Sequence, residues 1–247
     1  MNPNTVSIHI INPDLIPPDE HASCLSDEEI SRAAAFRFPA DARRWACFRG
    51  ATRKILSTRT RTTPHQVPIV LTDHGKPVLA HPFDHLHFSL SHCNDLGLLA
   101  ISTVGPIGID VEPRIRASEL LDCESTFCHP DEIGKLPIKH ISRCRELMNI
   151  WIAKEALLKA LGTGFIHPPE SVRLKPEASS HLMTAETQHA GASDQRIHQL
   201  EHPLLTAHRA ALSAPSRVNR IEILASEEST NPPPSEKVPP RSTNPDG

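Results

Sequence analysis

The stretch GPIGIDVEP, from Gly105 to Pro113, constrains the fold more than any other part of the chain. It is a short apolar run with glycine before it and proline after it, which is typical of a buried strand. Side chains alternate between the faces of a strand, so we expect Asp110 and Glu112 on the same face. Two carboxylates this close repel each other unless a cation lies between them. Paired oxygen ligands of this kind suit Mg²⁺.

A helix is predicted over WIAKEALLKALGTG, residues 151–164, because apolar residues recur there every three to four positions and two glycines follow. Glu155 and Lys159 are four residues apart and share a face of this helix, with Lys154 beside them. The set has two interpretations. It is either a third acidic ligand flanked by phosphate-binding lysines, or a solvated helix face with one ion pair.

Earlier segments contain further candidate groups. Ser26 and Glu29 have the spacing of a capping box and predict a helix from there to about residue 38. A second helix, from Ala42 to about Thr58 with Asp41 as its cap, contains four arginines. These arginines form either a solvated basic face or an anion site, to which Arg44 would belong.

Two more signals come from a turn and a strand. Lys76 lies in a tight turn between Gly75 and Pro77, where a lone lysine is usually solvated. Residues 87–92, HFSLSH, alternate as a half-buried strand that ends in Ser91 and His92. The strand forms a hairpin with residues 96–102. A histidine at a strand end is more often a structural hydrogen-bonding group than a site residue.

The combination of GIDVE with WIAKEALLK about forty residues later resembles the Sfp-type phosphopantetheinyl transferases. The segments LSDEE, FRFPADARR, DHGKP, HFSLSH and FCHPDE are similar to further motifs of that family, in the same order, so the resemblance covers residues 25–174. It departs from the family pattern at Cys93, where a small polar residue is common, and at Glu29, where some members have lysine. The resemblance implies coenzyme A contacts from Arg44, Lys76, Ser91, His92 and Lys154, Mg²⁺ ligands in Asp110, Glu112 and Glu155, and catalytic roles for Glu155 and Lys159.

The activity that this resemblance implies is Mg²⁺-dependent transfer of the 4'-phosphopantetheine arm of coenzyme A to a serine of an acyl or peptidyl carrier protein. Glu155 would accept the serine proton, directly or through a metal-bound water. Three alternatives stay open: an inactive homologue that only binds carrier proteins, a Mg²⁺-dependent phosphohydrolase, and a zinc-binding interaction module. The zinc module would use the loose cluster of Cys123, Cys128, His129, His140 and Cys144.

Helices and short antiparallel strands mix without regular βαβ alternation, so the expected fold class is α+β. The resemblance implies two similar α+β subdomains related by a pseudo-twofold, residues 1–104 and 105–226, with the ligand cleft between them. Residues 175–196 are expected to be a loop or irregular hairpin, and residues 204–213 and 218–225 to be strands. The proline-rich residues 227–247 have almost no apolar side chains and are expected to be a disordered tail.

Composition excludes several classes of partner. The chain has 247 residues, a net charge of −3 and no tyrosine, so neither a basic field nor a stacking platform argues for nucleic acid. No signal peptide or run of membrane-span length is visible, and the six cysteines form no CxxC pair. We therefore expect a monomeric cytoplasmic protein with reduced thiols that binds neither nucleic acid nor membrane.

Overall fold

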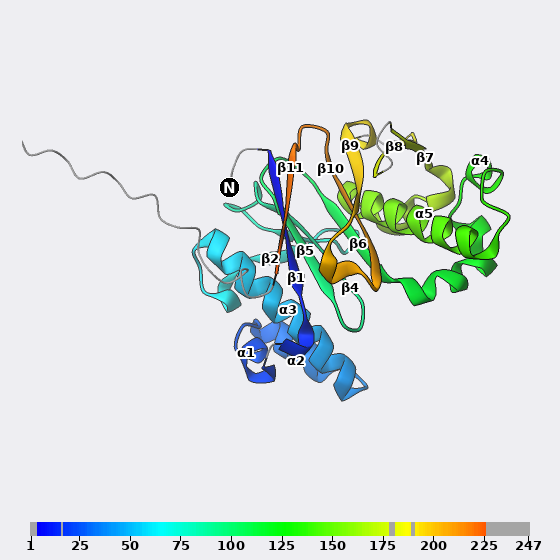
Figure 1. Cartoon of the computed structure of the whole chain (residues 1–247). Coiled ribbons are helices and arrows are strands. Elements are labelled where there is room, and N and C mark those ends of the chain that lie inside the picture. Colours follow the sequence, from blue (N-terminus) through cyan, green and yellow to red (C-terminus); the bar gives the residue numbers. More distant parts are fainter. Residues whose placement is uncertain (1–3, 16, 178–180, 189–190, 226–247) are drawn as a thin grey trace, which may run out of the picture.

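The computed structural model describes residues 4–15, 17–177, 181–188 and 191–225 (Figure 1). The helices are α1 (Pro18–Ala22), α2 (Asp27–Ala34), α3 (Pro39–Thr60), α4 (Pro130–Ile133) and α5 (His140–Leu161), and a 3₁₀ helix, η3, spans Arg114–Thr126. The strands are β1 (Thr5–Ile11), β2 (Ile69–Leu71), β3 (Pro77–Leu79), β4 (His87–His92), β5 (Gly97–Ser102), β6 (Gly108–Pro113), β7 (Arg173–Pro176), β8 (Leu182–Glu186), β9 (Gln195–Leu200), β10 (His208–Pro215) and β11 (Arg220–Leu224). No helix in the described ranges is long and apolar enough to cross a membrane.

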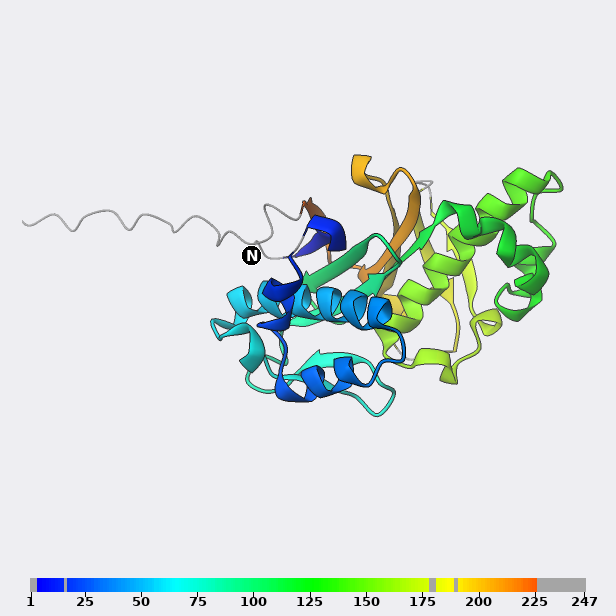
Figure 2. The ribbon, with the colours of Figure 1, turned by 90° about the horizontal axis from the view of Figure 1, so that it is seen from below.

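The first sheet has the strand order β11-β1-β5-β4. The strands β4 and β5 form the expected antiparallel hairpin, in which His92 lies opposite Gly97. Strand β1 is buried along its whole length, because β5 pairs with one of its edges and β11 with the other. Helix α3 packs its buried side chains, among them Phe48 and Leu56, against this sheet. In the view from below, α3 and α5 lie on different halves of the molecule (Figure 2).

The second sheet is antiparallel throughout, with the order β6-β10-β9-β8-β7. Helix α5 lies along it and buries Leu147, Ile152 and Leu157 in a cluster shared with η3. Each half of the molecule thus contains one large sheet covered by one helix of 22 residues, and the first half adds the two-stranded sheet β2-β3. The fold is α+β, as expected.

The two sheets meet where β4 lies beside β6. The Ser89 hydroxyl accepts a hydrogen bond from the Ile109 N–H at 3.1 Å, and the Ser91 hydroxyl accepts one from the Val111 N–H at 3.3 Å. Serine side chains therefore take the place of backbone carbonyls at this seam. An apolar cluster with contributions from β1, β5, β6 and β10 fills the space between the sheets, so the halves share one core.

Four expectations about elements need correction or fall outside the description. Strand β11, expected with the second half, pairs in parallel with β1 in the first sheet. Phe38 rather than Asp41 is the N-cap of α3, because Pro39 occupies the first turn, where its missing N–H costs nothing. Helix α2 ends at Ala34 rather than at about residue 38. Residues 175–196 contain β8, which forms an antiparallel hairpin with β7, one of the two expected arrangements. The expected tail, residues 227–247, lies outside the described residues.

Candidate active site

The centre of the candidate site is a three-residue network across the seam between the sheets. Lys159 Nζ of α5 donates to Asp110 Oδ1 of β6 at 2.7 Å and to Ser91 Oγ of β4 at 3.1 Å. The Ser91 hydroxyl donates to the same Asp110 oxygen at 2.9 Å. Three residues that the sequence analysis singled out therefore converge from three elements.

A close approach of β6 to α5 makes this network possible. A Cβ atom on Gly108 would lie 2.0 Å from the Ala156 carbonyl oxygen and 2.4 Å from the Ala160 nitrogen. Only glycine lets the strand lie directly on the helix backbone at this point. The contact places Asp110, two residues further along β6, within reach of the Lys159 ammonium.

The acidic groups around the network are electrostatically unbalanced. Asp110 is 4% exposed, and its second oxygen, Oδ2, is buried with no hydrogen-bond partner among the described residues. Burial, together with the Asp110 charge, raises the pKa of both Glu112 and Glu155 above the usual range. Asp110 thus disfavours the ionisation of Glu112 and Glu155, and a cation would stabilise this group of carboxylates.

The three carboxylates do not lie as close together as a tight metal cluster. Within the described part of the chain, His, Cys, Asp and Glu side chains bring three ligand atoms within 4.8 Å of one another at a single place, Cys93, Asp95 and His208. Glu112 is instead paired with Arg116 at 2.9 Å and hydrogen-bonded to the Trp151 side chain. Arg116 was not among the residues predicted from the sequence to belong to the site. The spacing of four residues gave no signal for this contact, because Glu112 lies on β6 and Arg116 lies in η3.

Lys76 reaches α5 from the turn between β2 and β3. Its ammonium donates to the carbonyls of Ile107, Lys159 and Ala160, at 3.1, 2.5 and 3.3 Å. Burial lowers its pKa to about 8. A cleft of about 360 Å³ opens beside it, lined by His74, Gly75, Lys76, Pro77, Phe88, Ser89, Leu90, Glu155, Leu158, Lys159, Gly162 and Gly164. Lys76, Glu155 and Lys159 therefore face one cleft.

His92 and Arg44 lie at the other side of the network. The His92 ring is stacked on Phe48, with 4.4 Å between ring centroids and 10° between planes. Burial lowers the pKa of His92, and the charges of Lys159 and Arg44 lower it further. Arg44 is paired with Asp41 at 3.2 Å and lines a second cleft with Arg43 and His21. Arg44 therefore adds a positive charge on this side of the network, whereas the lowered pKa of His92 favours its neutral form.

Lys154, a predicted coenzyme A ligand, is buried in the protein. It is 1% exposed, and its ammonium donates to Glu132 Oε2, the Phe127 carbonyl and the Pro169 carbonyl, at 2.7, 2.7 and 3.1 Å. All three donors of the ammonium are used inside the protein. These contacts give Lys154 a structural role between α4 and α5, and its contact with coenzyme A stays a prediction from the sequence.

Other candidate groups also have structural partners. Arg53 is buried against Glu29 and three backbone carbonyls, so it stabilises the packing of α2 on α3. The zinc cluster, one of the alternatives, does not assemble among the described residues. Cys123 Sγ is hydrogen-bonded to carbonyls of its own segment, and Cys144 Sγ lies 3.8 Å from His140 Nδ1 within α5. A zinc module built on that set is therefore excluded by the positions of its residues.

Two family models match the chain. One, described as the 4'-phosphopantetheinyl transferase superfamily, matches residues 106–213. The other, described as 4'-phosphopantetheinyl transferase, N-terminal, matches residues 18–104. With its two helix-covered sheets and the acidic and lysine groups at their seam, the chain belongs to the 4'-phosphopantetheinyl transferase superfamily, which confirms the family that the motifs indicated.

Individual relatives agree with this assignment. The chain is 34% identical over 168 residues to the 4'-phosphopantetheinyl transferase HetI of a Nostoc species, covering 66% of this chain and 71% of HetI. It is 28% identical over 153 residues to a phosphopantetheinyl transferase of a Thraustochytrium species, covering 57% of this chain and 53% of that protein. It is 35% identical over 101 residues to the 4'-phosphopantetheinyl transferase gsp of Aneurinibacillus migulanus, and the match covers 40% of each chain.

Proposed function

We propose that this chain transfers the 4'-phosphopantetheine arm of coenzyme A to a serine hydroxyl of an acyl or peptidyl carrier protein, and that the reaction requires Mg²⁺. Family membership supports the transferase class. The observation that supports the location of the chemistry is the Ser91–Asp110–Lys159 network beside the cleft that Lys76 and Glu155 line. A monomeric state and a cytoplasmic location stay predictions from the sequence.

The donor groups fit a divalent cation. Asp110, Glu112 and Glu155 supply carboxylate oxygens, the ligands that Mg²⁺ prefers, and the buried Asp110 Oδ2 has no partner within the described chain. We infer that these three residues hold the ion. When bound, Mg²⁺ would neutralise and orient the diphosphate of coenzyme A.

The residues of the chain then have distinct tasks. The Lys76 and Lys159 ammonium groups add positive charge where the diphosphate becomes more negative in the transition state. The carrier serine oxygen forms a bond to the β-phosphorus, while the bond from that phosphorus to the bridging oxygen breaks and adenosine 3',5'-bisphosphate leaves. Glu155 takes the serine proton, directly or through a water.

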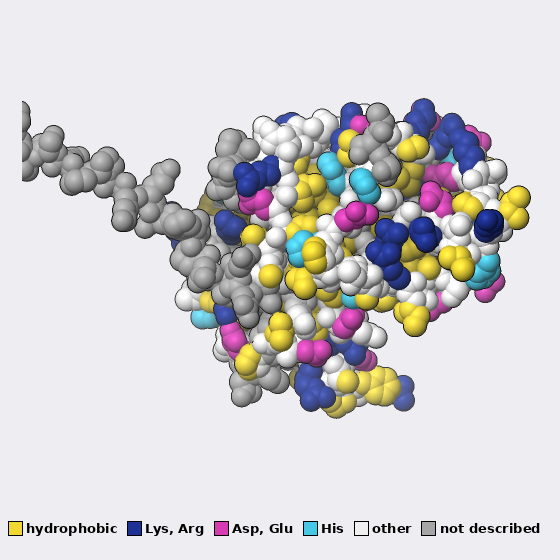
Figure 3. Space-filling view, viewed as in Figure 1, with side chains coloured by type: hydrophobic (Ala, Val, Ile, Leu, Met, Phe, Trp, Pro, Cys, Tyr) yellow, Lys and Arg dark blue, Asp and Glu magenta, His cyan; other side chains and the backbone are white. Residues whose placement is uncertain are grey.

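We propose that the carrier protein docks on a groove next to this site. Arg114, Arg145 and Arg209 line the groove together with the exposed side chains of Ile115 and Ile141. Arg209 lies opposite Glu112 in the β10–β6 pairing, so the groove adjoins a proposed metal ligand. Figure 3 shows Lys and Arg side chains gathered among hydrophobic ones over the end of the molecule that carries α5. Carrier proteins are usually acidic, and such a surface complements them.

The decisive experiment is intact mass spectrometry of an apo-carrier protein incubated with this protein, coenzyme A and Mg²⁺. We expect a mass gain of one phosphopantetheine arm, and no gain when EDTA replaces Mg²⁺. Asp110→Asn and Glu155→Gln should each slow the reaction by at least about 100-fold, because they remove a metal ligand or the base. Glu186→Gln, an exposed acid on β8, is the matched control and should leave the rate unchanged. Coenzyme A binding without any modification of several carriers would point to an inactive binding homologue.

The docking proposal has its own readout. Arg145→Glu should raise the KM for the carrier protein by about 10-fold and leave the KM for coenzyme A unchanged, because it reverses a charge at the groove only. Arg196→Glu on β9, outside the groove, is the control. A carrier KM that is insensitive to Arg145→Glu would place docking elsewhere.

A further inference from the structure

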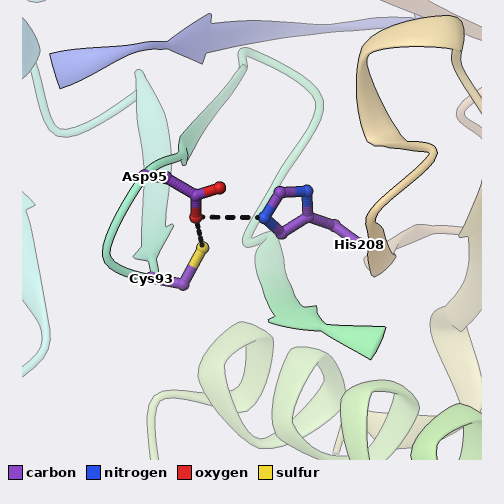
Figure 4. A group of neighbouring side chains, drawn as sticks. All are labelled: Cys93, Asp95 and His208. Carbon is purple, nitrogen blue, oxygen red and sulfur yellow. Dashed lines mark hydrogen bonds and ion pairs between the residues drawn. The ribbon is translucent and has the colours of Figure 1, made fainter. Parts of the chain in front are cut away.

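A second group of ligating side chains lies outside the transferase site. Cys93 and Asp95 come from the turn between β4 and β5, and His208 begins β10 of the other sheet (Figure 4). The Cys93 sulfur lies 3.3 Å from Asp95 Oδ1, and His208 Nε2 lies 3.2 Å from the same oxygen. All three ligand atoms are within 4.8 Å of one another. His208 is 113 positions from Asp95 and still further from Cys93, so only the fold brings them together.

From this arrangement we propose that Cys93, Asp95 and His208 form a Zn²⁺ site that joins the β4–β5 turn to β10. The donor set of one thiolate, one imidazole and one carboxylate is one that zinc takes in proteins. Zinc bonds of about 2.3 Å to sulfur and about 2.0 Å to nitrogen and oxygen, at tetrahedral angles, separate the ligand atoms by roughly 3.3–3.5 Å. The two contacts to Asp95 Oδ1 have this length, and the Cys93 sulfur and His208 Nε2 lie within 4.8 Å of each other. The ion can therefore replace the hydrogen bonds once the sulfur and the nitrogen approach.

The charges of the cluster also suit a divalent ion. When zinc binds, the Cys93 thiol loses its proton to solvent and a sulfur–zinc bond forms, while neutral His208 and ionised Asp95 donate lone pairs. A zinc ion bound to one thiolate and one carboxylate has no net charge. The site therefore places no net charge beside the His208 side chain, which is 5% exposed. The Asp95 side chain is 61% exposed and opens a path from solvent. A water would complete the tetrahedron.

The turn and the strand hold the ligands in place without the ion. The Cys93 N–H donates to the Leu96 carbonyl at 2.9 Å and closes the turn. The His208 carbonyl accepts a hydrogen bond from Arg114 Nε at 2.9 Å, and His208 pairs with Pro113 of β6. Zinc would therefore link the first sheet to the second, one residue away from His92. This proposal does not depend on the transferase reaction.

Metal analysis of the full chain, purified without a polyhistidine tag and dialysed after addition of ZnCl₂, tests the site. We expect about one zinc ion per chain, with at least about 10-fold weaker binding in Cys93→Ser and Asp95→Asn. Asp95 is exposed and Cys93 half-buried, so both variants should fold, which circular dichroism checks. Cys123→Ser changes a cysteine of similar exposure outside the cluster and should keep its zinc. Asp110→Asn should keep its zinc as well, which separates this site from the transferase site.

Cobalt substitution gives a second readout. Co²⁺ bound to the native chain should show a thiolate-to-cobalt charge-transfer band that is absent from Cys93→Ser. Loss of all zinc on dialysis of the native chain would overturn the proposal. Equal zinc content in the native chain and in Cys93→Ser would do the same, because it would show that the ion is bound elsewhere.

Discussion

Lys154 and Glu132 form a buried ion pair whose role is best tested by removing one partner. Lys154→Met leaves the Glu132 carboxylate buried with only the backbone N–H groups of His129 and Leu174 as partners. We expect the free energy of unfolding, measured by urea denaturation, to fall by about 3–5 kcal/mol. Coenzyme A should bind the folded variant with unchanged affinity in isothermal titration calorimetry.

The double variant Lys154→Met with Glu132→Gln is the control for this prediction. It removes the unpaired charge and should recover part of the lost stability. A single variant that keeps its stability and loses coenzyme A affinity would support the predicted contact of Lys154 with coenzyme A.

The buried His9 side chain should make the free energy of unfolding depend on pH. It is 2% exposed in β1, and neither ring nitrogen has a hydrogen-bond partner in the described structure. Burial, with a smaller effect of the Arg59 charge, lowers the pKa of His9 from 6.5 to about 4. Between these values the unfolded chain binds more protons than the folded chain, so stability is lost as the pH falls through that window.

The variant His9→Phe isolates this contribution. As the pH falls from about 7 to about 4, the native chain should lose up to about 3 kcal/mol more unfolding free energy than the variant, because only the native chain has this group to protonate. Urea denaturation of both proteins at each pH measures the difference. Equal losses would mean that His9 is solvated or paired.

At the scale of elements, the contact of β6 with α5 determines whether the site assembles. Gly108→Ala places a methyl group against the backbone of α5 and should force the helix away from the strand. We expect a loss of about 1–3 kcal/mol in stability. Phosphopantetheine transfer should fall further than this loss explains, because Lys159 moves away from Asp110.

Gly134→Ala is a matched control for this change. Gly134 has helical backbone angles, and its added methyl would be 3.8 Å from the nearest atom, the Pro130 carbonyl oxygen. Stability and activity should both stay at native levels in this variant. Native activity in Gly108→Ala would show that the helix and strand can separate without disturbing the site.

Local patterns predicted the elements that carry the site. Alternation placed β4 at residues 87–92, and the capping box at Ser26 and Glu29 is present. The face shared by Asp110 and Glu112 agrees with the effect of the Asp110 charge on the pKa of Glu112. These features depend on neighbouring residues, so one sequence contains enough information to find them.

Long-range pairing could not be predicted in this way. The burial of Lys154 depends on Glu132, 22 residues away, and β11 joins β1 from the other end of the described chain. The bounds of β8 could not be predicted within the expected loop or irregular hairpin, because its residues are only partly buried and show no clear alternation. The Cys93–Asp95–His208 cluster has no sequence spacing to reveal it, since His208 is supplied by a different sheet.

At the scale of the whole molecule, the two halves share their core. Val6 and Ile8 of β1 pack in one cluster with Ile109 of β6 and Leu212 of β10. Strand β11 adds a crossover from the second half to the first sheet. Each half also has a cluster of its own, around Phe48 in the first half and around Leu147 in the second, but the shared cluster joins them. We therefore expect the halves to unfold as one cooperative unit rather than as two domains.

The two tryptophans allow this expectation to be tested directly. Trp45 lies on α3 in the first half and packs against Phe36, whereas Trp151 lies on α5 in the second half and packs against Phe127. Trp45→Phe and Trp151→Phe each leave one fluorescent reporter. Within each variant, the urea midpoint from the remaining tryptophan should coincide with the midpoint from far-ultraviolet circular dichroism, because a shared core transmits the loss of either half. If the Trp45 reporter changed at a lower urea concentration than the circular dichroism signal, the first half would be unfolding independently of the second.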